Sequence, residues 1–358
     1  MAHLFDPYEL RGTRVRNRIM VSPMCQYSAV RGVPQPWHLA HLGGLARGGA
    51  GLVMAEATAI VPEGRISPRD TGLWNDEQVA AWAPIAAFIT ALGAVPGVQL
   101  AHAGHKASTW WPWAADRGSV PVGDGPEDGW QTVGPSATGY PGLAAPRALA
   151  TDEVASVVSA FVAAAQRAQA AGFEVIELHA AHGYLLHEFL SPLSNDRTDR
   201  YGGDLLGRSR LLQEVVVAVR AAWPADRPLL VRLSTTDWVE GGHTIDDSVA
   251  VAGWIRDLGV DLVDCSSGGI SPEQQIPVGP GYQVPMAARI RHEAGIATAA
   301  VGLITQPAQA EAILGEGSAD LVTLGRAMLR DPHWPLRAAH ELGVELPWPA
   351  QYRLASRW

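Results

Sequence analysis

The sequence has few of the features that mark secreted or membrane proteins. Only two of its 358 residues are cysteines, Cys25 and Cys265, and this pair, far apart in sequence, offers no disulfide framework. No segment approaches the roughly 20 consecutive apolar residues that a membrane-spanning helix needs. The N-terminal residues also lack a signal-peptide pattern. We therefore expect a cytoplasmic protein that has no membrane partner.

The sequence also has little charge and no basic stripe. Charged residues make up 18% of the chain and the net charge is −9, which argues against nucleic acid as the main partner. No G-x-G-x-x-G follows the first expected strand, so a Rossmann domain loses its main support. Hydrophobic residues make up 47% of the chain, and this ordinary globular composition allows one large core.

What the chain does have is an alternation of short apolar runs with longer amphipathic segments. About eight strand-helix units follow one another without a linker, which predicts an α/β protein with one (β/α)8 TIM barrel over residues 1–358. The expected strands cover 17–21, 51–55, 97–100, 174–178, 229–233, 262–265, 297–301 and 321–324. The expected helices cover 37–48, 76–92, 151–172, 205–223, 244–258, 284–294 and 306–314, with Thr151 as the N-cap of the third.

A long excursion without periodicity follows the third expected strand, over residues 107–148. It is rich in proline, glycine and tryptophan, and a loop of this length in a compact enzyme is usually a lid or a binding loop. Its tryptophans suggest a flat, apolar ligand nearby, or they anchor the loop to the barrel.

Polar residues gather at the expected strand ends, which in a barrel form the active site. His179, His182 and Tyr184 follow one strand, and their spacing alone allows a metal site, a proton relay, a ring of donors around a ligand, or histidines that merely satisfy backbone groups. The other polar residues on this face are Cys25, Tyr27, Gln99, His102, Lys106, Arg232 and Arg326.

The last two strands predict a phosphate site. Gly302 and Gly325 each follow a strand and precede a helix, and Arg326 adds positive charge, although simple glycine turns would give the same pattern. Across the barrel, Gln99 and Arg232 can hold the polar edge of a flat heterocycle. The alternative for Arg232 is an internal ion pair with a carboxylate such as Glu56.

Four motifs together carry a resemblance to a known family. They are SPMCQY from Ser22, QLAHAGHK from Gln99, HAAHGYLLHEFLSPLSNDRTDRYGG from His179 and LGRAMLRDP from Leu324. The chain resembles the Old Yellow Enzyme family of FMN-dependent ene-reductases, and within it the thermophilic-like branch that also holds xenobiotic reductases. The resemblance implies a TIM barrel, non-covalent FMN, NADPH or NADH as the hydride donor, and reduction of activated C=C bonds in small molecules such as α,β-unsaturated carbonyl compounds.

The resemblance also implies roles for individual residues. Tyr27, His179, His182 and Tyr184 would face the substrate, and Cys25 would lie beside the flavin. The residues that would contact FMN are Ser22, Pro23, Met24, Cys25, Ala57, Gln99, Arg232, Gly302, Gly325 and Arg326.

The expected chemistry follows from the side chains themselves. Hydride from flavin N5 can reach the β-carbon of an enone only if charge on the carbonyl oxygen is stabilised, and the N–H groups of His179 and His182 can do this. Tyr184 is placed to protonate the α-carbon, unless it merely packs under the lid. Cys25 would tune the flavin potential, or it is only a small buried hydrophobe.

The tail from Pro347 onward is aromatic and basic. It includes Trp348, Tyr352, Arg353, Arg357 and Trp358, and we expect it to dock near the active site of a partner in a homodimer or homotetramer. Packing on its own barrel is the alternative.

Two rival functions remain open at this point. One is a metal-dependent lyase or hydrolase that uses His179 and His182, and the other is a barrel that binds a phosphorylated ligand without turning it over.

Overall fold

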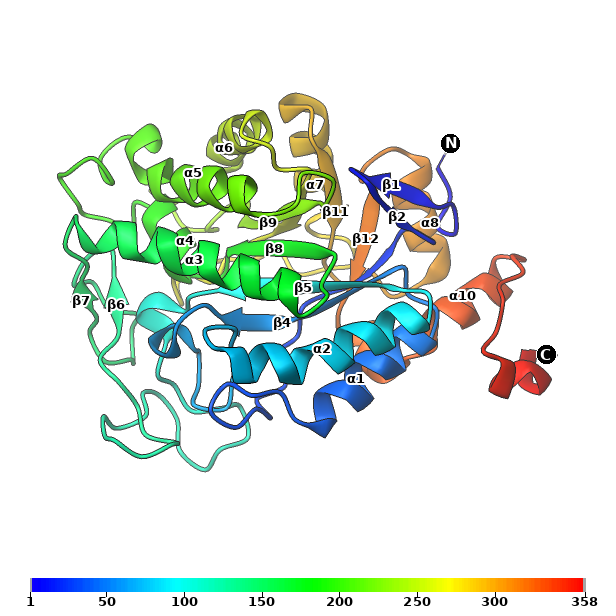
Figure 1. Cartoon of the computed structure of the whole chain (residues 1–358). Coiled ribbons are helices and arrows are strands. Elements are labelled where there is room, and N and C mark those ends of the chain that lie inside the picture. Colours follow the sequence, from blue (N-terminus) through cyan, green and yellow to red (C-terminus); the bar gives the residue numbers. More distant parts are fainter. Residues whose placement is uncertain (1, 357–358) are drawn as a thin grey trace.

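The computed structural model describes residues 2–356, and eight parallel strands within them close into a barrel (Figure 1). This confirms the predicted (β/α)8 fold. In their order around the barrel the strands are β10 (Leu262–Ser266), β11 (Ala297–Ala300), β12 (Leu321–Leu324), β3 (Ile19–Val21), β4 (Leu52–Ala59), β5 (Val95–Ala101), β8 (Val175–Ala180) and β9 (Leu229–Ser234).

Alternation along each strand separates two layers inside the barrel. Near the strand starts, the inward side chains form one apolar cluster with members such as Met20, Leu230 and Leu262. Two residues further along β9 and β10 stand Arg232 and Asp264, both buried. The barrel therefore has an apolar floor and a polar upper layer. A hairpin of β1 (Tyr8–Leu10) and β2 (Thr13–Val15) packs its apolar side chains onto the floor.

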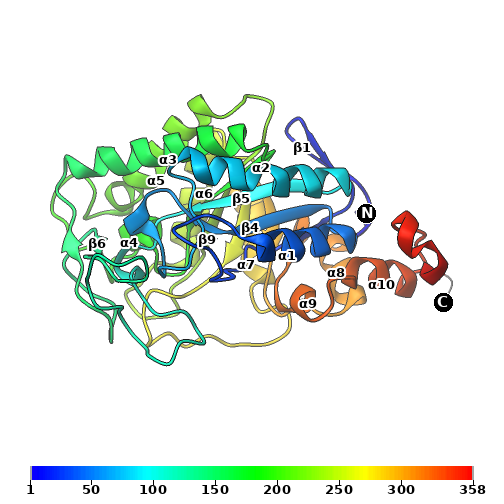
Figure 2. The same ribbon diagram turned by 60° about the horizontal axis from the view of Figure 1, so that its bottom comes forward.

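Helices surround the strands. The larger apolar core lies between the outer face of the barrel and these helices. Figure 2 shows α1 and α2 side by side on one flank of the barrel. The helices are α1 (Pro36–Arg47), α2 (Asp76–Ala91), α3 (Glu153–Ala170), α4 (Leu185–Leu190), α5 (Leu205–Ala222), α6 (Ile245–Asp257), α7 (Val284–Arg289), α8 (Pro307–Gly315), α9 (Arg326–Arg330) and α10 (Trp334–Glu341). The helix predicted over 284–294 continues past α7 as a π-helical turn, Ile290–Ala294.

Two local predictions are wrong. The second strand does not end before Glu56, because a register shift between Ala55 and Ala57 lets β4 continue to Ala59. Such a bulge re-aims a side chain, and Glu56 here pairs with His38 of α1. Thr151 does not cap the third helix either. Its hydroxyl donates to Asp199 at 2.5 Å.

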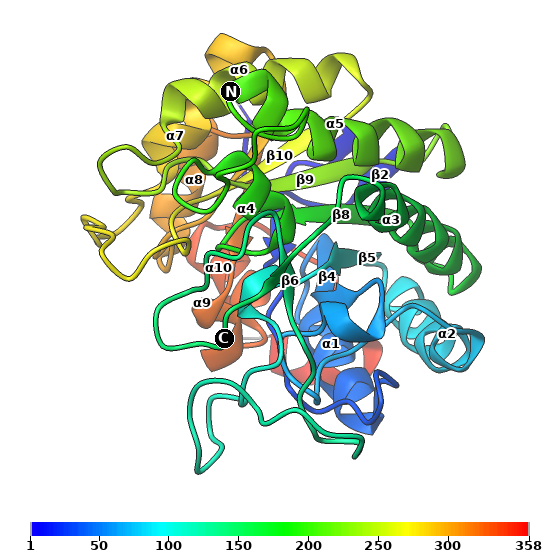
Figure 3. The ribbon, with the colours of Figure 1, turned by 90° about the vertical axis from the view of Figure 1, so that its left-hand side faces the viewer.

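The excursion and the tail lie at opposite ends of the barrel. The excursion contains only the two-residue strands β6 (Val133–Gly134) and β7 (Arg147–Ala148), and it loops around the end of the barrel that faces the viewer in Figure 3. The tail ends in a 3₁₀ helix, Ala350–Ser356, at the far end (Figure 1). Within residues 2–356, no helix has the length and apolar character to cross a bilayer.

Candidate active site

His179, His182 and Tyr184 form one compact cluster at the end of β8. The ring of His179 lies between the other two, with its centroid 5.1 Å from that of His182 and 4.8 Å from that of Tyr184. Both contacts are edge-to-face. The structure therefore brings together the three residues that the sequence placed at one strand end.

His179 is a neutral hydrogen-bond donor. Its Nδ1 accepts the N–H of Ala181 at 3.3 Å, so the ring proton resides on Nε2. Burial lowers the pKa of His179 well below its usual value, and the charge of Arg232 lowers it further. At neutral pH the ring offers one N–H donor that carries no charge of its own.

His182 is held by side chains from the ends of β9 and β10 and from the segment that follows β5. It has a left-handed φ of 61°, and its N–H donates to the Ser234 hydroxyl at 2.9 Å. Its Nε2 lies 2.6 Å from the Ser266 hydroxyl. Lys106, the only lysine in the sequence, donates to the carbonyls of His182 and Gly269, both at 2.9 Å. These contacts fix the backbone of His182 in a conformation that few non-glycine residues adopt.

Tyr184 stays protonated in this setting. Burial raises the pKa of its phenol well above the usual value, and the nearby Cys25 and Asp70 add to the rise. The ammonium group of Lys106 lies 5.6 Å from the centroid of the tyrosine ring. A phenol held neutral in a buried site has a proton available to donate.

Cys25 and Tyr27 pack with Tyr184 against a small apolar wall. The wall consists of Ala57, Ile66, Ala101, Ala103 and Ala107, with Trp130 also packed against it. Burial raises the pKa of the Cys25 thiol well above its usual value, with Asp70 and Glu56 adding to the rise. A thiol in this state is a poor nucleophile. The excursion reaches this group, because the ring of its Trp113 lies 5.7 Å from that of Tyr27.

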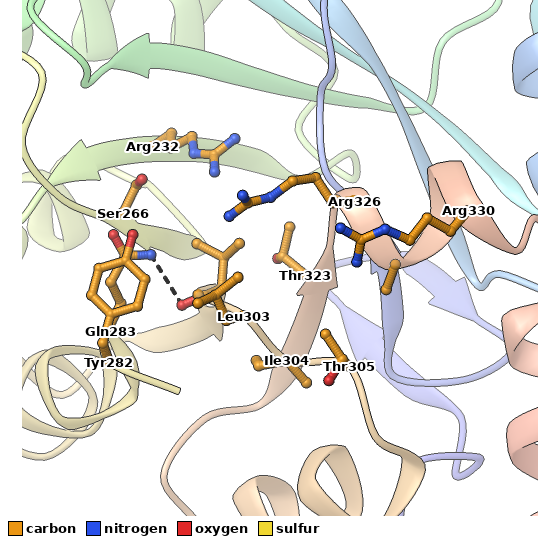
Figure 4. Close-up of a pocket in the computed structure, with 14 residues that line it drawn as sticks. Arg232, Ser266, Tyr282, Gln283, Leu303, Ile304, Thr305, Thr323, Arg326 and Arg330 are labelled. Atoms are coloured by element: carbon orange, nitrogen blue, oxygen red, sulfur yellow. Dashed lines mark hydrogen bonds between the residues drawn. The ribbon is translucent and has the colours of Figure 1, made fainter. Parts of the chain in front are cut away.

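A separate cavity of about 180 Å³ lies at the ends of β11 and β12. Figure 4 shows Arg326 and Arg330 of α9 pointing toward it, with Arg232 at one side. Within residues 2–356, no carboxylate or hydrogen-bond acceptor contacts either Arg326 or Arg330. Two uncompensated guanidinium groups make this cavity suitable for an anion.

Two glycines form the walls of this cavity. Gly302 has a φ of 128°, and a Cβ there would lie 3.2 Å from the ring of Tyr282. A Cβ on Gly325 would lie 3.7 Å from Met24 and from Ser22. At both positions the missing side chain leaves space beside the arginines, and this fits a phosphate that approaches the backbone closely.

Arg232 is ion-paired, but not with the carboxylate named from the sequence. Its Nε lies 3.2 Å from Asp264, and the pair is almost fully buried. Glu56 cannot serve because the bulge in β4 turns it toward His38. One Nη of Arg232 donates to the Ser22 hydroxyl at 3.2 Å.

Gln99 and Glu177 belong to the same polar layer. The Gln99 amide donates to Glu177 at 2.7 Å. Burial raises the pKa of Glu177 to about 8, with the charge of Asp264 also raising it and that of Arg232 lowering it. At pH 7 a carboxyl group with this pKa is mostly protonated, and it lies in the same layer as the buried ion pair of Arg232 and Asp264.

The cavity and the histidine cluster are parts of one elongated site. Ser266 lines the cavity and also contacts His182. In the barrel order, β12 stands opposite β8 and β11 opposite β5. A ligand with its phosphate at the cavity and a flat polar ring over Gln99 and Arg232 would span the mouth, so the donor set fits FMN. Within residues 2–356, no three His, Cys, Asp or Glu side chains form a group that could hold a metal.

Sequence reasoning missed several residues of this site. They are Glu177, Ser266, Tyr282, Gln283 and Arg330. Arg330 could have been found, because it follows Arg326 by four residues and therefore shares its helix face. His102 does stand at the end of β5, but its ring lines a different cavity.

Comparison with known proteins gives a consistent result. The model of the family described as "NADH:flavin oxidoreductase / NADH oxidase family" matches residues 3–345. An NADPH dehydrogenase of Halalkalibacterium halodurans is 45% identical over 351 residues, which are 98% of this chain and 97% of that protein.

Two solved structures are similar over nearly the whole fold. Morphinone reductase in complex with tetrahydroNAD superimposes with a TM-score of 0.79 at 28% identity, covering 98% of this chain and 93% of that one. The Old Yellow Enzyme homologue from Zymomonas mobilis gives a TM-score of 0.79 at 28% identity, covering 96% and 94%.

Proposed function

The chain belongs to the NADH:flavin oxidoreductase / NADH oxidase family, and from this premise we propose that it reduces activated C=C bonds of small α,β-unsaturated carbonyl compounds. The coarser activity is established by the family and its relatives. The chain is an NAD(P)H-dependent flavin oxidoreductase of the Old Yellow Enzyme type that uses FMN.

The observation that carries the proposal is the pairing of neutral donors with a neutral phenol. His179 presents an Nε2–H beside the ring of His182. Tyr184, whose ring contacts that of His179 on the other side, is protonated at neutral pH. An α,β-unsaturated carbonyl needs both, a donor for the oxygen on which negative charge develops and a proton for the α-carbon.

The chain's own residues would hold FMN along the elongated site. Gly302, Gly325, Arg326 and Arg330 line the cavity that would take the phosphate. Gln99 and Arg232 would hold the polar edge of the ring system. Bound FMN supplies the hydride acceptor and donor that no side chain can provide.

The two rival functions have less support. A metal-dependent lyase would need further ligands around His179 and His182, and none stands close within residues 2–356. Binding of a phosphorylated ligand without turnover would not explain why a buried Tyr184 lies beside two neutral imidazoles.

Product analysis tests the proposal. Purified holoenzyme with NADPH and cyclohex-2-enone under anaerobic conditions should yield cyclohexanone in a 1:1 ratio to the NADPH consumed. If no saturated ketone forms anaerobically and NADPH is consumed only after oxygen is admitted, the flavin activity stands and alkene reduction is rejected.

Arg326→Ala is expected to weaken FMN retention. A charged hydrogen bond to a phosphate contributes about 1.5–3 kcal/mol, so the dissociation constant should rise about tenfold to a hundredfold. Fluorescence titration of the apoprotein with FMN measures this. Arg210→Ala, at an arginine on α5 outside the cavity, is the control. Equal affinity in the Arg326 variant would remove the phosphate from this cavity.

The tail supports a homo-oligomer, which remains a proposal. Tyr352 contacts its own barrel, with its ring 5.8 Å from that of His333 and 5.2 Å from the Arg47 guanidinium. Arg353 and Leu354 beyond it are exposed, whereas Arg357 and Trp358 lie outside the described residues. Because the tail is remote from its own active site (Figure 1), only a partner's site is within its reach.

Deleting residues 353–358 is expected to raise the KM for the alkene while FMN stays bound. The reason is that the deletion removes the part of the tail that would contact a partner's substrate site. Steady-state kinetics and light scattering on the truncated protein measure this. Parent-like kinetics together with the parent's mass would reject a role for the tail.

A further inference from the structure

We infer that the protein has a second small-molecule site, outside the barrel and separate from the flavin site, for a neutral ligand about the size of one six-membered ring with one acceptor oxygen. The site is a cavity of about 190 Å³ between the ends of β4 and β5, the excursion and α3. The buried His102 is one of its polar lining residues.

His102 faces this cavity because side chains alternate along β5. Gln99 and Ala101 turn toward the barrel interior and mouth, where they contact Glu177 and the wall beside Tyr184. His102 is therefore directed outward, and it lines the cavity rather than the mouth. Ligands in the two sites would lie on opposite sides of β5.

His102 presents an unused donor to the cavity. Its Nδ1 accepts the N–H of Gly104 at 3.1 Å, so the proton resides on Nε2. Within residues 2–356, nothing accepts a hydrogen bond from that Nε2–H, although the residue is only 4% exposed. Burial lowers the pKa of His102 to about 4, so the ring is neutral at pH 7. The Nε2–H is open to the cavity, where a ligand oxygen can accept it in place of water.

The remaining lining fixes the chemistry of the ligand. Ile60, Val133, Leu149, Val157 and Ala160 supply apolar walls. The charge of Arg147 at the rim is already balanced, since its two terminal nitrogens lie 2.7 and 2.9 Å from the carboxylate oxygens of Glu153. Glu63, an exposed carboxylate, also lines the cavity. A neutral donor and this further negative charge favour a neutral ketone, aldehyde or alcohol over an anion.

The size of the cavity favours a single ring. An apolar cavity of about 150 Å³ engineered into another protein holds benzene, and this one is somewhat larger. One backbone hydrogen bond connects this cavity with the active site. The carbonyl of His102 accepts the N–H of Leu185, the residue after Tyr184.

The test uses 4,4-difluorocyclohexanone as the probe and 19F NMR of the FMN-loaded enzyme as the readout. In parallel, flavin absorbance reports occupancy of the active site. The parent should show a bound probe population that persists in His179→Ala and leaves the flavin spectrum unchanged. Ala160→Trp, which fills the cavity from α3, should abolish that population.

Ala155→Trp is the matched control, because Ala155 is exposed on α3 and does not line the cavity. It should bind the probe like the parent. The inference is overturned if the parent binds no probe, if all binding is lost in His179→Ala, or if Ala160→Trp binds as well as Ala155→Trp. None of these results depends on whether the enzyme reduces alkenes.

Discussion

His179→Ala should slow reoxidation of the NADPH-reduced enzyme by cyclohex-2-enone about a hundredfold, because removing one donor to a developing oxyanion costs about 3 kcal/mol. Reduction of the flavin by NADPH should change far less. The reason is that, in the proposed function, the Nε2–H of His179, fixed by the Ala181 contact to Nδ1, would donate to the carbonyl oxygen of the alkene substrate.

Anaerobic stopped-flow spectroscopy separates the two half-reactions. His182→Ala should show the same division, and the double variant should lose less than the product of the two effects, since both donors would serve one oxygen. His292→Ala, at an exposed histidine far from the site, is the control. If neither half-reaction changes in His179→Ala, the donor role of His179 is wrong.

Tyr184→Phe should slow the same alkene-dependent step by about two to four orders of magnitude, the usual range for loss of a general acid. The phenyl ring keeps the contact with His179, which involves the ring and not the hydroxyl. Reoxidation by molecular oxygen should remain near the parent rate, because it needs no proton at an alkene carbon.

Two further measurements make the Tyr184 result specific. Tyr140→Phe removes the hydroxyl of another tyrosine that lies under Lys106, and it should leave the alkene rate unchanged. Binding of a phenolic ligand, read from the flavin spectrum, should survive in Tyr184→Phe. An alkene rate equal to that of the parent would mean that solvent, and not Tyr184, supplies the proton.

The barrel could be predicted from the sequence because its signal is local. Each strand is a short apolar run bounded by turn residues, and each helix has its own apolar face. The positions of the predicted site residues could be inferred for a related reason. In a closed parallel barrel every strand end lies on one face, so His179 and Arg326 needed only a correct strand boundary to be placed together.

What the sequence could not predict depends on partners distant along the chain. A bulge of one residue directs Glu56 to His38, and the register of β9 and β10 places Asp264 beside Arg232. Likewise, the helix expected to start at Thr151 begins at Glu153 instead, because the Thr151 hydroxyl is engaged by Asp199, 48 residues away.

The role of Lys106 shows the same limit. Its position at a strand end was visible in the sequence, but its contacts are with two carbonyls, those of His182 and Gly269, on other loops. No sequence pattern predicts such a contact, because every residue has a backbone carbonyl that could accept the hydrogen bond. The conformation of His182 that depends on it became apparent only in the folded chain.

In the proposed function, this site passes reducing equivalents from NADPH to an activated alkene. Enzyme purified with its FMN, reduced anaerobically by one equivalent of NADPH and then mixed with cyclohex-2-enone, tests it most directly. We predict that the flavin absorbance near 450 nm returns at a rate that rises with enone concentration, and that cyclohexanone forms in equal amount. A flavin that stays reduced in the presence of enone, and reoxidises only when oxygen is admitted, would contradict the account.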